Sequence, residues 1–277
     1  MRIVLGTGLL ALAAGGAWAE PSLERGTYLV EGPMACGNCH TPFGEAGFDS
    51  AKALGGRLVI EDEMLGTAIA PNITPGSRVA DWTDEELARA IREGLRPDGT
   101  VIGPPMPIGL YRGLSDDDVM SVVMYLRQVP AVENDPGESS FKIALPPSYG
   151  PPVEAVPAPA VGASAEYGAY VAGPVAHCIE CHTPMGPQGP DFEHRLGAGG
   201  FPFGNPDGSV TLSANITPTG LGEYDDEQLE HIIRTGERPD GTRLHPVMPV
   251  WGYAQMTDED MAAVILYLRA LPPQENG

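Results

Sequence analysis

The chain has 277 residues, of which 16 are lysine or arginine and 37 are aspartate or glutamate, so its formal net charge is −21. A surface this acidic repels phosphate groups, which makes nucleic acid and anionic membrane surfaces poor partners. The length allows two domains of ordinary size.

Residues 1–19 have the composition of a secretory signal peptide. Arg2 precedes an apolar run over residues 3–14, and Ala17-Trp18-Ala19 forms an Ala-x-Ala-type cleavage site. We therefore expect export to the periplasm, although an uncleaved membrane anchor is the alternative. The longest later apolar stretch covers only residues 261–268, so we expect no transmembrane segment in the mature chain.

An internal repeat divides the rest of the chain into two copies. Matching residues lie 142 positions apart along most of the repeat, as in Tyr28 and Tyr170 or Cys36 and Cys178. A long period that is present twice indicates a tandem domain duplication. We expect one domain over residues 20–132 and another over 163–277. The proline-rich segment 133–162 between them is predicted to be an extended linker.

Three helices are predicted in each copy, over residues 22–31, 83–94 and 115–129 and over 164–172, 225–236 and 257–271. The second helix carries the clearest signals, because Thr83 with Glu86 has the spacing of a capping box and Gly94 is suited to end the helix. No comparable alternating pattern predicts strands. We therefore predict an all-α fold.

All four cysteines lie in two copies of one motif, Cys36-Gly37-Asn38-Cys39-His40 and Cys178-Ile179-Glu180-Cys181-His182. Cys-x-x-Cys-His is the attachment signature of haem c, in which both thiols form thioethers and the imidazole binds the iron. A thioredoxin-like pair, a zinc site or a structural disulfide would leave the histidine after each pair unexplained. The sequence therefore predicts two covalent haem c groups, with Cys36, Cys39, Cys178 and Cys181 as the attachment residues and His40 and His182 as iron ligands.

The second iron ligand of the first copy is predicted to be a methionine. His40 is the only histidine before the linker, which excludes a second histidine ligand unless one comes from the other copy. Met106 is the best candidate, because prolines on both sides fix its loop. The competing methionines are Met34, Met64, Met120 and Met124.

In the second copy Met248 occupies the position that matches Met106. His245 lies three residues before it and is the alternative ligand.

The shared Cys-x-x-Cys-His-Thr-Pro and Asn-Ile-Thr-Pro segments, with Leu-Ser-Asp before a Tyr-Leu-Arg helix, give the chain a family resemblance. It resembles bacterial periplasmic c-type cytochromes with class I domains, especially the multihaem cytochrome c subunits of membrane-associated alcohol and gluconate dehydrogenases. The resemblance implies two tandem class I cytochrome c domains, with His40 and Met106 as one axial pair and His182 and Met248 as the other. Those subunits typically have three haem domains, whereas this chain has two attachment motifs.

These features favour a periplasmic diheme cytochrome c, an electron-transfer protein and not an enzyme. It would pass single electrons from a dehydrogenase to a downstream acceptor such as a terminal oxidase or another cytochrome, and His-Met ligation suits that role. The alternatives are a diheme cytochrome c peroxidase-like enzyme with one open haem site, and a structural subunit of a larger complex.

Overall fold

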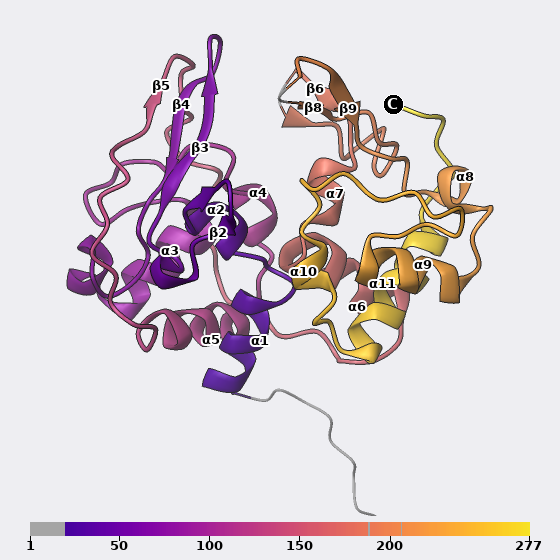
Figure 1. The fold of residues 1–277 in the computed structure, drawn as a ribbon. Coiled ribbons are helices and arrows are strands. Elements are labelled where there is room, and N and C mark those ends of the chain that lie inside the picture. Colours follow the sequence, from indigo (N-terminus) through magenta and orange to yellow (C-terminus); the bar gives the residue numbers. More distant parts are fainter. Residues whose placement is uncertain (1–19, 188, 206) are drawn as a thin grey trace, which may run out of the picture.

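The computed structural model describes residues 20–187, 189–205 and 207–277. The two halves of the chain lie side by side in Figure 1, the first in indigo to magenta and the second in orange to yellow. The predicted signal peptide, residues 1–19, lies outside the described residues.

Short helices build most of each half. The first half contains α1 (Leu23–Glu31), α2 (Gly37–His40), η1 (Ser50–Lys52), η2 (Arg78–Asp81), α3 (Asp84–Glu93), α4 (Ile108–Tyr111) and α5 (Asp116–Leu126). The second half contains α6 (Ala165–Tyr170), the π-helical turn η3 (Val171–Val175), α7 (Cys178–Cys181), α8 (Pro218–Leu221), α9 (Asp226–Thr235), α10 (Val250–Tyr253) and α11 (Asp258–Ala270).

The structure confirms the predicted helices. Thr83 and Glu86 form the capping box of α3, and Asp225 and Gln228 form that of α9. Each of these helices is followed by a glycine in the left-handed region, Gly94 in the first half. The first helix of the second half is divided, because α6 continues into the wider turn η3, which contains a proline.

The first and last helices of each half cross at a glycine. A Cβ atom on Gly26 of α1 would lie 2.0 Å from the Ser121 carbonyl oxygen of α5, and one on Gly168 of α6 would lie 1.9 Å from the Ala263 carbonyl oxygen of α11. No side chain fits in either place, so glycine is what lets the two backbones touch. Each crossing holds the two ends of one half together.

Each half has its own hydrophobic core around that crossing. In the first, Leu29, Leu114 and Val123 are fully buried, and in the second Val171 and Met261 are. The same packing arrangement around a glycine crossing therefore occurs in both halves.

The prediction of an all-α fold is wrong, because antiparallel strands accompany the helices. They are β1 (Phe43–Gly44), β2 (Gly47–Phe48), β3 (Arg57–Asp62), β4 (Gly66–Ala70), β5 (Ser140–Phe141), β6 (Met185–Gly186), β7 (Gly189–Pro190), β8 (Pro202–Gly204) and β9 (Val210–Leu212). The longest pair, β3 and β4, forms the hairpin that projects at the top of Figure 1.

The sequence pattern hides these strands for a physical reason. β3 has a register irregularity between Leu58 and Ile60, and its side chains are exposed or half-buried with no fully buried face. A strand without a fully buried face shows no alternation of apolar and polar residues. The other strand of the hairpin, β4, also pairs with β5, whose residues lie more than 70 positions after their partners and come from the predicted linker.

The chain at the boundary between the first predicted domain and that linker packs against the first half. Asn72 Nδ2 donates a hydrogen bond to the Val132 carbonyl (2.7 Å), and Asn134 Nδ2 donates one to the Gly55 carbonyl (2.8 Å). The chain that follows α11 repeats the first of these contacts in the second half, where Asn215 Nδ2 donates to the Gln274 carbonyl (2.8 Å). The segment around Val132 therefore contacts the first half as the segment around Gln274 contacts the second.

The two halves also exchange hydrogen bonds through a symmetric pair of aspartates. Asp118 of α5 accepts from Arg25 Nε of its own half (2.7 Å) and from the Tyr170 hydroxyl of the other half (2.5 Å). Asp260 of α11 accepts from the Tyr167 hydroxyl of its own half (2.8 Å) and from the hydroxyl of Tyr28 in the other half. Both carboxylates are buried, so these hydrogen bonds join the halves away from solvent.

Candidate haem-binding sites

Each attachment motif forms one helical turn. In the first half Cys36 caps α2 and Cys39 and His40 end it, and in the second half α7 runs from Cys178 to Cys181. Burial raises the pKa of the Cys36 and Cys178 thiols to about 12. A redox-active cysteine pair has a lowered thiol pKa instead, so these thiols are unlike those of a disulfide oxidoreductase.

Both motif histidines are held through the same ring nitrogen. His40 Nδ1 lies 2.8 Å from the Pro71 carbonyl oxygen, and His182 Nδ1 lies 2.7 Å from the Ala214 carbonyl oxygen. A carbonyl can only accept, so Nδ1 carries the hydrogen and Nε2 keeps a free lone pair. Burial lowers the pKa of both imidazoles and keeps them neutral. Each histidine is thus prepared to bind iron through Nε2.

The threonine after each motif fixes the next loop, a role that the sequence analysis did not assign. Thr41 Oγ1 accepts a hydrogen bond from the Leu54 amide (3.1 Å), and Thr183 Oγ1 accepts one from the Gly197 amide (3.1 Å). Both threonines are buried. The signal was the shared Thr-Pro after both motifs, which the sequence analysis used only as a family marker.

The candidate axial methionines occupy matching places. Met106 and Met248 are half-buried and pack against the core of their own half. The carbonyls of both accept from an amide two residues further on, at 2.8 Å in each case, at the start of α4 and α10. The two loops therefore have the same local conformation.

The competing ligands lie elsewhere or are already bonded. Met34 is buried in the first core, and Met64 is 81% exposed near the end of the β3–β4 hairpin. His245 Nε2 lies 2.7 Å from Asn205 Oδ1, and its Nδ1 accepts from the Val247 amide at 3.2 Å. With both ring nitrogens engaged, His245 is a weaker candidate than Met248.

The two motifs approach each other where the halves meet. Burial raises the pKa of the Cys181 thiol to about 12, and Glu180 and Cys39 of the other half add to that increase. Burial also raises the pKa of Glu180 to about 7. His177, directly before the second motif, has its Nε2 3.3 Å from the Met34 carbonyl oxygen of the first half. Side chains such as Glu180 and His177 therefore lie close to both attachment motifs.

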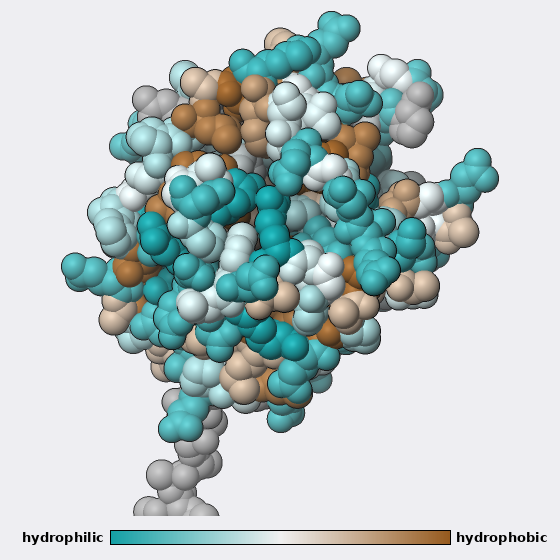
Figure 2. Space-filling model, turned by 90° about the vertical axis from the view of Figure 1, so that its left-hand side faces the viewer, coloured by the Kyte–Doolittle hydropathy of each residue, from teal (hydrophilic) through white to brown (hydrophobic). Residues whose placement is uncertain are grey.

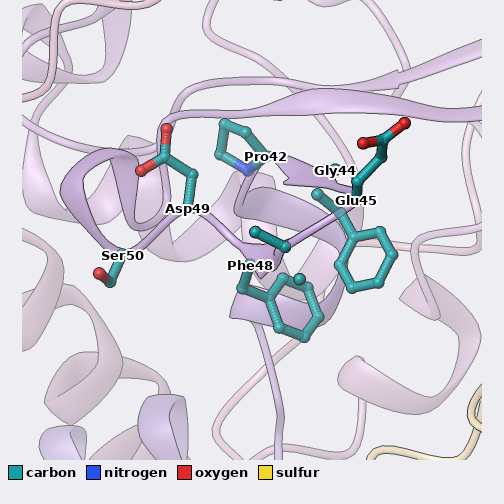
Figure 3. Close-up of a pocket in the computed structure, with 9 residues that line it drawn as sticks. Pro42, Gly44, Glu45, Phe48, Asp49 and Ser50 are labelled. Carbon is teal, nitrogen blue, oxygen red and sulfur yellow. The ribbon is translucent and has the colours of Figure 1, made fainter.

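Aromatic rings line the loop that follows the first motif. Figure 3 shows this loop, residues 42–50, which borders an open pocket of about 520 Å³. The Phe43 and Phe48 rings lie 5.0 Å apart, and the Phe48 ring lies 5.9 Å from the Trp251 ring of the other half. This apolar surface suits a partly exposed porphyrin edge.

These residues fit covalently bound haem in three respects. All four thiols are free, both imidazoles present Nε2, and Arg57 has a buried Nε without a hydrogen-bond partner among the described residues. A haem propionate is an acceptor that would satisfy such a donor. Within the described part of the chain, no group of three or more His, Cys, Asp or Glu side chains is placed to hold a metal ion.

Comparison with known proteins agrees with this geometry. Residues 167–268 match the family model for the cytochrome c oxidase cbb3-type subunit III. The chain is related to the c-type cytochromes. It is 27% identical over its whole length to an alcohol dehydrogenase (quinone) cytochrome c subunit of Gluconobacter oxydans, and 27% identical over 93% of its length to a fructose dehydrogenase cytochrome subunit of Gluconobacter japonicus.

A third relative is closer in size. The chain is 29% identical to a diheme cytochrome c-type protein of Cereibacter sphaeroides, with 87% of the chain matched to 83% of that protein. By contrast, it covers only 54% of the fructose dehydrogenase subunit and 61% of the alcohol dehydrogenase subunit. All three of these relatives are named as cytochromes or cytochrome subunits. Within the described ranges, every helix is too short or too polar to cross a lipid bilayer.

Proposed function

We propose that this chain holds two covalent haem c groups and passes single electrons between protein partners in the periplasm. The electron donor is a dehydrogenase, and the acceptor is a terminal oxidase or another cytochrome. The observation that carries the proposal is the duplicated motif with its histidine fixed through Nδ1 in both halves. The names of the relatives, cytochrome subunits of dehydrogenases among them, support the same role.

The chain's own residues would bind the two haems and orient the histidines that hold the irons. Cys36, Cys39, Cys178 and Cys181 would form the thioether bonds, and His40 with Met106 and His182 with Met248 would hold the two irons. Bound haem supplies an iron centre that gains and loses one electron. The Pro71 and Ala214 carbonyls keep each imidazole in one orientation, which limits the movement that a change of iron charge demands.

The proposal is tested on the full chain, produced with a c-type cytochrome maturation system. Haem content and the mass of the mature chain should show two attached haems and cleavage after Ala19. The variants Cys36→Ala/Cys39→Ala and Cys178→Ala/Cys181→Ala should each lose one haem. The reduced protein should not bind carbon monoxide readily, since both axial positions are filled.

Two results would contradict this function. Attachment of a single haem would remove the diheme assignment, and ready carbon monoxide binding by one haem would favour the peroxidase-like alternative with one open site.

A further inference from the structure

Arg57 marks one position at which the two sites differ. Arg57 begins β3 and pairs with Ala70 of β4. In the second half the Gly200 amide donates to the Ser213 carbonyl (2.9 Å), and Ser213 lies 143 residues after Ala70, as Gly200 does after Arg57. The neighbouring contacts keep this offset, because the Gly56 amide bonds the His40 carbonyl and the Gly199 amide bonds the His182 carbonyl. A cation in one half therefore corresponds to a glycine in the other.

The Arg57 side chain reaches the first motif. Its Nη2 donates to the Asn38 carbonyl (2.8 Å), and its Cζ lies 5.9 Å from the centre of the Phe43 ring. The guanidinium group thus lies against the motif Cys36-Gly37-Asn38-Cys39-His40, whose histidine is placed to bind iron.

No carboxylate neutralises this charge within the described residues. Arg57 forms none of the ion pairs found there, and its buried Nε has no hydrogen-bond partner among them. A charge without a protein counter-ion is not offset locally, so it acts over a longer distance than the charge of an ion pair does. The same donor can bond a haem propionate, whose single negative charge the arginine would offset.

The second half cannot place a side chain at this position. Gly200 has φ +83°, and a Cβ atom there would lie 2.5 Å from the Gly277 carbonyl carbon. The nearby cation Arg195 bonds the Glu275 and Asn276 carbonyls instead.

Other charges do not cancel the difference. Glu180 lies where the motifs meet and raises the pKa of cysteines in both halves, after burial as the larger cause. Its charge is therefore shared between the sites, whereas that of Arg57 acts on one.

We propose that Arg57 gives the haem held by Cys36, Cys39 and His40 the higher reduction potential, so that the electron of the singly reduced protein resides in the first half. This proposal rests on the proposed diheme function. A fixed positive charge stabilises the reduced iron, which carries one positive charge less than the oxidised iron. Electrons that enter through the second half would then run toward the first.

The test is a spectroscopic potentiometric titration of the full holoprotein and its variants. Arg57→Gln should lower the higher of the two potentials by about 59 mV, the one-electron equivalent of a tenfold change in the equilibrium constant, and leave the lower one in place. Arg57→Lys keeps the charge and should retain most of the original potential. Arg195→Gln is the matched control from the second half and should move neither.

The proposal is overturned if Arg57→Gln shifts only the lower potential, shifts both potentials equally or shifts neither. It is also overturned if the higher potential decreases as much in Arg57→Lys as in Arg57→Gln. Single-haem variants keep its failure separate from failure of the diheme assignment. The Cys178→Ala/Cys181→Ala protein, which keeps the first motif, should have a higher potential than the Cys36→Ala/Cys39→Ala protein, and Arg57→Gln should shift the former alone. Haem counts report on the diheme assignment, and these shifts report on Arg57.

Discussion

Hydrogen bonds to the ring nitrogens determine which histidines can bind iron. His40 and His182 donate through Nδ1 to a backbone carbonyl and keep Nε2 available, whereas His245 uses both nitrogens within its own half. The three histidines therefore differ in their ability to bind a metal ion. The difference comes from partners such as Asn205, which lies 40 residues from His245 in the sequence.

The axial methionines give the first prediction at this scale. Met106→Ala should remove about half of the long-wavelength sulfur-to-iron absorption band of the oxidised holoprotein, because one of two methionine ligands is lost. Met120→Ala is the control, since Met120 also packs partly buried against the first core and should leave the band unchanged. A full band after Met106→Ala would refute the assignment. A full absorption band after Met248→Ala would likewise refute Met248 as the ligand of the second site.

His177 gives a prediction about pH. Burial lowers the pKa of His177, so the folded protein holds it neutral while the unfolded chain binds a proton near the ordinary pKa of about 6.5. Its contribution to stability is therefore complete above that pH and is lost as the pH falls through the lower, folded value. His177→Asn, which tolerates the positive φ of 41° at this position, should reduce the decrease in melting temperature of the holoprotein on acidification.

The exposed His231 provides the comparison for that measurement. His231→Gln should leave the dependence of melting temperature on pH as in the wild type. An equal dependence in His177→Asn and wild type would show that another group is responsible.

At the scale of helices, the crossing glycines are the positions least able to change. Gly26→Ala should destabilise the protein by about 1 to 3 kcal/mol, because the new methyl group overlaps the Ser121 carbonyl and the helices must separate. Gly109→Ala in α4 is the matched control, since a Cβ atom there meets nothing within 4 Å. Chemical denaturation of the holoproteins measures both. Equal stability of the two variants would mean that the two helices can separate at the crossing without loss of stability.

The same scale shows what the sequence could reveal. Helix α3 was predictable because Thr83, Glu86 and Gly94 specify both of its ends through contacts within the helix. Strand β4 was not, because its partners are β3 and the distant β5. The motif cysteines and histidines were evident from spacing alone. Arg57 was not, because its nearness to the motif arises from the turn of chain between α2 and β3.

At the scale of the whole molecule, the exchanged tyrosines are expected to make the two halves unfold as one unit. Tyr28→Phe with Tyr170→Phe removes one hydrogen bond from each buried aspartate and leaves the partners from its own half, Tyr167 for Asp260 and Arg25 for Asp118. A hydrogen bond to a charged group contributes about 1.5 to 3 kcal/mol. Calorimetry should show the single transition of the wild type broadening or separating into two.

Tyr125→Phe is the control for this pair, because Tyr125 bonds Glu31 within the first half (2.6 Å). The Tyr125→Phe variant should still unfold in one calorimetric transition. A single, unchanged transition in the double variant would show that apolar contact between the halves is sufficient.

The acidic surface leads to a prediction about partners. The face in Figure 2 is mostly hydrophilic, with hydrophobic residues in separate patches, and the whole chain carries a formal charge of −21. If a basic partner docks on this surface, its electron-transfer rate should fall as salt rises, because screening acts beyond about 10 Å at 0.1 M. Stopped-flow reduction by the dehydrogenase partner measures this. A rate independent of salt would assign the acidity to solubility and docking to apolar contact.

The arrangement of the halves resembles a two-fold dimer whose subunits have been joined into one chain. In a dimer of identical chains, every substitution appears in both subunits, so two equivalent sites keep equal properties unless something outside distinguishes them. Joining the copies removes that constraint: position 57 and position 200, or Asn38 and Glu180, can differ while the shared packing is kept. A fused pair can therefore have a built-in direction, which a symmetric pair lacks at equilibrium.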